Sequence, residues 1–196
     1  FRNAEIPSPI MNGLAYDYFE NDGAPWTALP DFDTLTPVST GTLLNFSIAP
    51  RARDDNFGFR FTGYIEAPAT GYYTFHLNSD EGSRLWIGDT LVVDNDGLPG
   101  AAREASGAIG LKQGLHRLKV AMFEQTGGET LEVRWEGPAI AESLVPDGAL
   151  FRLNAPPTVR ISWPLDGSLF GVGAEIAFQA DCDDCDGSVV KVEYIL

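Results

Sequence analysis

The sequence contains little cysteine or histidine. Its 196 residues include two cysteines, Cys182 and Cys185, and two histidines, His76 and His116. Two cysteines cannot form a disulfide framework, so a hydrophobic core must hold the protein together. A zinc site needs four ligands, and both histidines lie far from the cysteines in the sequence. These scarcities exclude a disulfide-rich scaffold and argue against a zinc site.

Positive charge is also scarce. The chain has 13 Lys and Arg against 28 Asp and Glu, which gives a formal net charge of −15. Nucleic acids and anionic membranes are bound chiefly through Lys and Arg, so neither is expected as a partner. No apolar run approaches the ~18 residues that a membrane span requires, and we predict no membrane insertion.

Catalytic signatures are missing as well. The sequence has no G-x-S-x-G, no H-E-x-x-H and no phosphate-binding loop. Adjacent acids such as Asp80 and Glu81 rarely flank a glycosidic bond at the required separation of ~5–9 Å. We therefore predict a protein that is not an enzyme.

Turn residues and β-forming residues dominate what is present. The 21 glycines and 13 prolines interrupt short runs rich in Val, Ile, Thr, Phe and Tyr, and no long amphipathic helix is evident. About nine or ten strands fit within residues 1–153, which predicts an all-β, antiparallel two-sheet β-sandwich. The clearest predicted strands cover 13–19, 43–48, 57–66, 72–77, 85–87, 91–93, 104–112, 115–124 and 129–136.

Alternation along two of these strands identifies the expected core. Phe57, Phe59 and Phe61 share one face of their strand, and the next strand continues the set with Tyr73, Phe75 and Leu77. Between the first two strands, residues 20–42 form a long excursion that Trp26 and Phe32 are expected to anchor.

The composition changes at residues 154–157, Asn-Ala-Pro-Pro, where a double proline is typical of a stiff linker. We predict one domain over 1–153, with its core at 13–152, a linker at 154–157, and a partial second domain over 158–196. Three expected strands there are too few to close a sandwich. The exposed edge near Leu196 would favour self-association or pairing with a further segment.

Several motifs occur in the order of one known family. NFGFRFTGYIEAPATGYYTFHLNSDEGSRLWIGDTLVVDNDG is followed by SGAIGLKQGLHRLKVAMFEQTGGETLEVRWEGP and VPDGALFR. This order resembles the PA-fourteen family, the β-sandwich domain first described in anthrax protective antigen. Residues 155–196 resemble the start of a bacterial immunoglobulin-like repeat. The resemblance implies a secreted or cell-surface module that accompanies adhesins or glycan-processing enzymes.

The resemblance also implies a calcium site that binds carbohydrate. In the family's lectins, two adjacent aspartates joined by a cis peptide hold the metal with an Asn or Gln side chain from a second loop. The matching residues are Asp80 and Glu81, with Gln125 in the loop 124–128; Glu81 departs from the family's second Asp. Calcium prefers oxygen ligands, and sugar hydroxyls can complete its coordination. The alternative for residues 78–82 is an ordinary Asx-type turn.

Other residues are candidates for sugar contact. Asn95 and Asp96 end the next hairpin strand and Gly127 lies in the second loop, so we expect these three at the rim of the site; Asp-Asn-Asp-Gly is also favourable turn chemistry. Trp26, Tyr72 and Trp86 could stack on a sugar ring, but we expect these rings to be packed in the sandwich.

The cluster DCDDCDG at 181–187 favours a small-loop disulfide between Cys182 and Cys185 in a secreted chain, and its aspartates leave a loose calcium site open.

Two functions therefore remain from different classes. The first is a non-catalytic, calcium-assisted carbohydrate-binding module of a secreted or cell-surface protein. The second is a structural subunit or spacer of an extracellular fibre without a sugar site, whose C-terminal sheet is completed by a neighbour.

Overall fold

The computed structural model describes residues 1–184 and 189–193. The chain divides into two compact units, Phe1–Leu153 and Asn154–Leu196. The described residues form antiparallel β-sheets and two short 3₁₀ helices, with no α-helix among them. No helix in the described part is long and apolar enough to cross a membrane. The predicted all-β class is confirmed.

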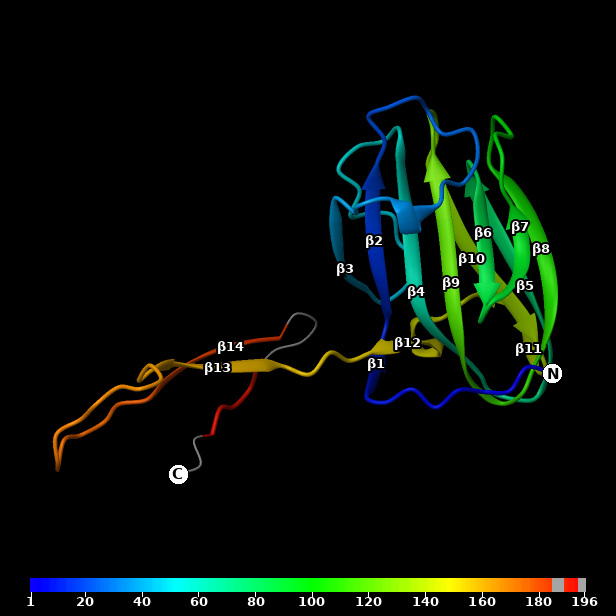
Figure 1. Cartoon of the computed structure of the whole chain (residues 1–196). Helices are drawn as coiled ribbons and strands as arrows, with labels where there is room; N and C mark the ends of the chain where they lie inside the picture. The colour runs from blue at the N-terminus through cyan, green and yellow to red at the C-terminus, as the bar shows by residue number, and fades with distance from the viewer. Residues whose placement is uncertain (185–188, 194–196) are drawn as a thin grey trace. The chain divides into compact units, whose positions relative to one another are not determined.

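The first unit is a sandwich of two sheets (Figure 1). In the larger sheet the order is β1-β12-β4-β9-β6-β7, and β2 pairs with both β3 and β4. Its strands are β1 (Ile10–Asn12), β2 (Leu14–Glu20), β3 (Ser39–Leu43), β4 (Phe57–Ala67), β6 (Ser83–Ile87), β7 (Thr90–Asn95), β9 (Gly114–Glu124) and β12 (Leu150–Leu153). The smaller sheet, in the order β11-β10-β5-β8, contains β5 (Gly71–Asp80), β8 (Arg103–Leu111), β10 (Thr130–Gly137) and β11 (Ile140–Leu144).

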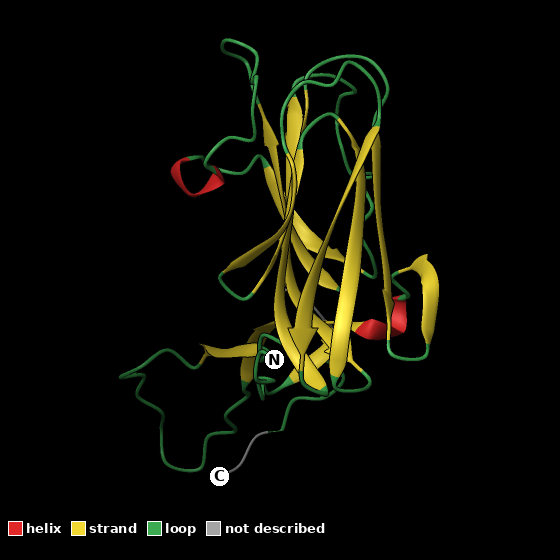
Figure 2. Cartoon of the chain, turned by 90° about the vertical axis from the view of Figure 1, so that its right-hand side faces the viewer, coloured by secondary structure: helices red, strands yellow, loops and turns green. Residues whose placement is uncertain are grey.

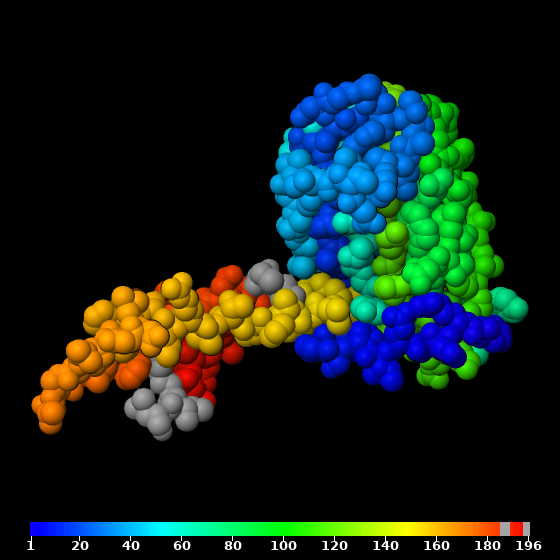
Figure 3. All heavy atoms as spheres, in the orientation of Figure 1, coloured from blue at the N-terminus to red at the C-terminus, as the bar shows by residue number. Residues whose placement is uncertain are grey.

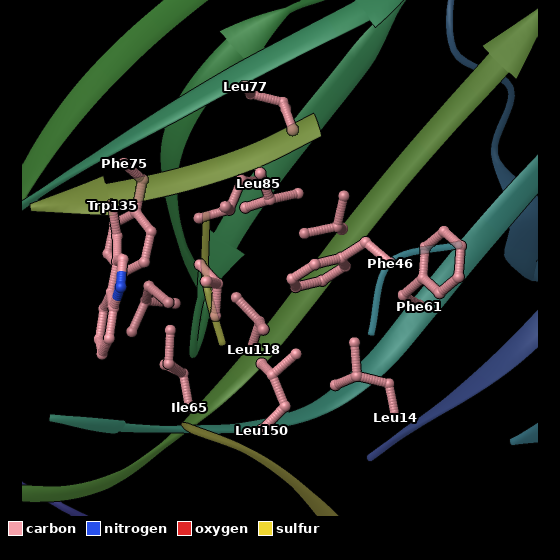
Figure 4. Close-up of a cluster of buried hydrophobic side chains, with 14 of the residues drawn as sticks. Leu14, Phe46, Phe61, Ile65, Phe75, Leu77, Leu85, Leu118, Trp135 and Leu150 are labelled. Carbon is pink, nitrogen blue, oxygen red and sulfur yellow. The ribbon is translucent and has the colours of Figure 1, made fainter. Parts of the chain in front are cut away.

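The core lies between the two sheets, where the sequence alternation predicts it. The three phenylalanines of β4 and the set Tyr73, Phe75 and Leu77 of β5 are all fully buried. Figure 4 shows Phe61 and Leu118 of the larger sheet in one buried cluster with Phe75 and Trp135 of the smaller sheet. Burial of this apolar area, at about 25 cal/mol per Å², is the main stabilising contribution in a unit without a disulfide framework.

Residues 21–38 cross the outer face of the larger sheet and include the helix η1 (Phe32–Thr34). Figure 2 shows η1 standing out from that face. Phe32 is buried and stacks on Phe19 of β2, with ring centroids 4.4 Å apart, and Trp26 meets Phe32 edge-on at 6.0 Å. The two predicted aromatic anchors therefore hold this segment against the sheet.

Several strand predictions differ from the structure. A strand was expected at 43–48, but the strand in this region, β3, covers Ser39–Leu43. Beyond it, the Asn45 side chain accepts from the backbone N–H of Phe46 and donates to the carbonyl of Val145, and these bonds replace strand pairing. The short strands β1 and β11 were not predicted. Tyr72 was expected to be packed, but it is 73% exposed and its ring lies 5.2 Å from that of Phe1.

In the second unit, β13 (Thr158–Trp163) pairs antiparallel with β14 (Gln179–Asp183). The third strand expected there is not formed at 189–193, and its remaining residues lie outside the described part. These two strands do not establish the predicted immunoglobulin-like fold. Cys182 is exposed on β14, whereas Cys185 lies outside the described residues, so the disulfide stays a prediction.

Candidate functional site

The Asp80–Glu81 turn lies at the end of the sandwich that is uppermost in Figure 1. It joins β5 of the smaller sheet to β6 of the larger one, and Asp80 pairs with Thr130 of β10. The peptide bond between Asp80 and Glu81 is cis. The Glu81 N–H donates to the carbonyl of Phe123, at 3.1 Å, next to the end of β9. The turn and the loop 125–129 therefore lie side by side.

The Glu81 carboxylate fastens this loop. The side chain is buried, and its Oε2 accepts a hydrogen bond from the backbone N–H of Gln125 at 3.0 Å. Burial raises the pKa of Glu81, the bond from Gln125 opposes that rise, and the neighbouring Asp80 carboxylate adds to it. The glutamate that replaces the family's second aspartate thus spans the gap between the turn and the loop.

Two hydrogen bonds, one from the backbone nitrogen and one from the side-chain nitrogen, fix the orientation of Gln125. Its backbone N–H binds Glu81, and its side-chain Nε2 donates to the carbonyl of Trp26 at 2.9 Å. Because the amide nitrogen is used in this way, the amide oxygen is the atom of Gln125 left to accept or to coordinate. The predicted partners Asp80, Glu81 and Gln125 are therefore brought to one end of the sandwich.

Glu124 also belongs to this region, although the sequence analysis included it only in the loop 124–128 and not as a site residue. It is fully buried, and neither carboxylate oxygen has a hydrogen-bond partner among the described residues. Burial raises the pKa of Glu124 to about 8, helped by the negative charges of its acidic neighbours. Those neighbours, in decreasing order of effect, are Glu81, Asp80, Glu129 and Asp55. The signal was present in the sequence, since Glu124 continues the buried row Leu118, Val120 and Met122 of β9.

A buried polar network supports the turn from inside. Ser79 Oγ donates to the carbonyl of Glu81 at 2.8 Å and lies 2.6 Å from Ser83 Oγ. The Asn95 side chain donates to Ser79 Oγ and to the carbonyl of Arg103, and it accepts from Arg103 Nε at 2.8 Å. Asn95 is fully buried. It therefore lies beneath the turn, and its side chain does not reach the surface rim where a sugar contact was predicted.

The other two predicted rim residues differ from each other. Asp96 Oδ1 accepts from the backbone N–H of Leu29 at 2.7 Å and its Oδ2 pairs with Arg84 at 3.1 Å, so this carboxylate ties down residues 21–38. Gly127 is exposed with φ +117°, and an added Cβ would meet nothing within 4 Å. Gly127 thus stays available at the surface, whereas Asp96 has a structural role.

The donor chemistry of this end fits a hard cation. Carboxylate and amide oxygens are what calcium prefers. Glu124 adds a further carboxyl group to this end, and its oxygens have no hydrogen-bond partner among the described residues. Within the described residues, no three His, Cys, Asp or Glu side chains converge as a metal site. A calcium ion here would therefore be held by Asp80, Glu81 and Gln125, and the other ligands would come from main-chain carbonyls and ligand hydroxyls.

Two anti-sigma factor proteins are similar to this chain. The anti-sigma-I factor RsgI3 of Acetivibrio thermocellus is 28% identical over 153 residues, which cover 74% of this chain and 22% of that protein. An anti-sigma factor domain-containing protein from Clostridium clariflavum is 27% identical with a TM-score of 0.60, covering 74% of this chain and 48% of that one. The chain thus spans about a fifth to a half of these relatives.

A third similarity is to a protein whose name includes sugar binding. The PA14 sugar-binding domain from an RTX adhesin is 16% identical with a TM-score of 0.60, and the match covers 72% of this chain and 98% of that domain. At this identity the similarity establishes the fold alone. The sequence itself matches the PA14 domain over residues 11–149. Together with the two-sheet sandwich, this match shows that the chain belongs to the PA14 domain family.

Proposed function

We propose that the first unit is a non-catalytic carbohydrate-binding module that uses calcium at the Asp80–Glu81 turn. The observation that carries the proposal is the hydrogen bond from Gln125 N to Glu81 Oε2, which joins two segments far apart in the sequence at one acidic end of the sandwich. The sugar-binding RTX adhesin domain of the same fold supports a carbohydrate as the ligand.

In this proposal each residue has a separate task. Asp80 and Glu81 supply carboxylate oxygens to calcium, and Gln125 supplies its amide oxygen. When bound, calcium would attract vicinal sugar hydroxyls that complete its coordination. Glu81 also holds the loop through Gln125 N, while Gly127 leaves the surface open for the sugar. Asn95 and Asp96 act indirectly, by fixing the turn and the segment 21–38.

The test measures metal and sugar separately. Calcium should raise the melting temperature, and EGTA should reverse this rise, because an ion that binds only the folded state stabilises it. A glycan array in calcium should give hits that EGTA removes. Asp80→Asn should abolish both the calcium-dependent rise in melting temperature and the glycan binding. Asp89→Asn is the control, because it makes the same charge change at a 94% exposed side chain in the β6–β7 hairpin. It should abolish neither effect.

The rival, a structural subunit without a sugar site, makes the opposite prediction. It expects oligomers or filaments, no calcium-dependent shift and an empty glycan array. A monomer that binds a glycan in calcium would exclude the structural subunit. An oligomer with no calcium-dependent shift and no glycan bound would exclude the lectin proposal.

We also propose a setting for the module, the ligand-sensing part of a regulatory protein, on the basis of the two anti-sigma factor relatives at 27% and 28% identity. In the natural full-length chain, the bound sugar should then change the activity of a sigma-factor-dependent reporter, and Asp80→Asn should remove the response. A reporter that ignores a sugar bound by the isolated chain would contradict this setting.

A further inference from the structure

The outer face of the larger sheet carries a hollow that none of the functions above uses. It has a volume of about 260 Å³ and is bordered by residues 29–33, part of the light-blue segment on this face of the first unit in Figure 3. Side chains from three adjacent strands, β4, β9 and β6, form its floor. The main ones are Arg60, Arg84, Trp86, Lys119 and Ala121.

The hollow exists because a small residue lies between two long ones. Ala121 of β9 pairs with Arg60 of β4 on one side and with Arg84 of β6 on the other, so the three form one row across the sheet. Neighbouring strands are about 4.8 Å apart, which puts the two arginine backbones about 10 Å apart. The methyl group between them leaves a gap, and Phe32 of η1 closes one side of it.

Positive charge gathers here in a strongly acidic chain. Three of the 13 basic residues line this one hollow, together with two acids, Asp31 and Asp33. Two of them are neutralised: Arg60 pairs with Asp17 at 2.8 Å and with Asp33 at 2.6 Å, and Arg84 binds Asp94 and Asp96.

Lys119 differs from the two arginines. It makes no ion pair with any residue that the structure describes, and its Nζ lies 4.3 Å from the centre of the half-buried Trp86 ring. An ammonium over an indole ring combines a charge with an apolar surface. The hollow thus presents one unpaired cation, one aromatic ring and, at its edge, the exposed carboxylate of Asp31.

We propose that this hollow binds one unit of an acidic saccharide, a hexuronic acid, independently of calcium. A single unpaired ammonium matches the single negative charge of a uronate carboxylate. The Lys119 ammonium lies over the Trp86 indole, so it must turn from the ring to the uronate carboxylate before the indole offers the apolar surface that a pyranose ring packs on. Asp31 then accepts hydrogen bonds from hydroxyls. The volume suits one sugar unit, since it is below the ~300–1,000 Å³ of pockets that hold drug-sized ligands.

The test is calorimetric titration of the whole chain with a trimer of hexuronic acid, in EGTA so that no metal can bridge the uronate to acidic residues. A neutral hexose trimer is the matched ligand. We expect the acidic trimer to bind and Lys119→Gln to weaken it by about tenfold or more, as for a central charged contact. Lys112→Gln, the same charge change at an exposed lysine in the β8–β9 turn, should leave the affinity unchanged.

Two further variants separate this site from the calcium site. Asp80→Asn should remove calcium-dependent binding and leave the EGTA titration unchanged. Ala121→Ser, a small change in the row between the arginines, should keep binding, whereas Ala121→Leu should fill the gap and reduce it. Equal affinity in the wild type and in Lys119→Gln, equal affinity for the neutral trimer, or no binding in EGTA would each overturn the proposal, whatever the outcome at Asp80.

Discussion

At the scale of single residues, Glu124 has a carboxyl pKa that its surroundings shift strongly. Its carboxyl is fully buried at the acidic end of the sandwich and its pKa is raised from 4.5 to about 8. A folded-state pKa above the unfolded value means that the folded protein holds the proton more tightly. The resulting stability is fully present below the unfolded pKa and is lost as the pH rises through about 8.

The calcium-free protein should therefore lose stability between pH 5 and pH 8. Glu124→Gln keeps the shape of the side chain and removes the charge, so its stability should stay level over this range and exceed that of the wild type at pH 8 by a few kcal/mol. Urea unfolding in EGTA at pH 5, 6.5 and 8 measures the difference. Glu132→Gln, on the outer face of β10, is the control. If the free energy of unfolding changed with pH in the same way in the wild type and in Glu124→Gln, Glu124 would not be the source of the pH dependence.

The candidate site illustrates how far single residues can be predicted. Asp80, Glu81 and Gln125 were identified through family resemblance, and the structure brings them together. Asn95 was placed at the rim because Asp-Asn-Asp-Gly ends the next hairpin strand, beside the expected site. Only the register of β7 against β6, with Asn95 paired to Ser83, shows that the side chain points inward. Side-chain direction at a strand end depends on this pairing, which local sequence does not contain.

At the scale of elements, the segment 21–38 connects the two candidate sites. Its Trp26 carbonyl orients the Gln125 side chain, its Leu29 N–H binds Asp96, and Phe32 and Asp33 border the hollow. The segment lacks strand ladders of its own, so its position depends on a few side-chain contacts. Its aromatic anchors were predictable because Trp26 and Phe32 are the two aromatic residues of this stretch, whereas its course over the sheet was not.

Phe32→Ala should release this segment without unfolding the sandwich. The substitution removes the stack on Phe19, a contact outside the main core, and should cost about 3 kcal/mol locally. Limited proteolysis should then cut within 21–38 at least several-fold faster and calcium should bind more weakly, because Gln125 loses its anchor at Trp26. Tyr72→Ala removes an aromatic ring that is 73% exposed, and it should change neither the proteolysis rate nor the calcium affinity. Unchanged proteolysis in Phe32→Ala would show that other contacts fix the segment.

At the scale of the whole molecule, the first unit is closed by strands from both of its ends. β12 pairs with β4 through Leu150 and Phe151 and with β1 through residues 10–12, so the last strand of the unit is held between an early strand and the core. The family match ends at residue 149, just before this strand. The strands in the middle of the unit were predictable from alternation, but β1 is too short for a periodic signal and depends on its long-range pairing with β12.

The end of β12 therefore sets the boundary of the folding unit. A chain of residues 1–153 should melt at the temperature of the first unit in the full chain, because the unit Phe1–Leu153 contains every strand of the sandwich's two sheets. It should also show the calcium response that we propose. A chain of residues 1–149 lacks the fully buried Leu150 and leaves β1 and part of β4 unpaired. It should lose about 3 kcal/mol or more, since removing one buried leucine side chain alone costs 2–5 kcal/mol. Scanning calorimetry of the two chains measures this, and equal melting temperatures would mean that β12 lies outside the cooperative unit.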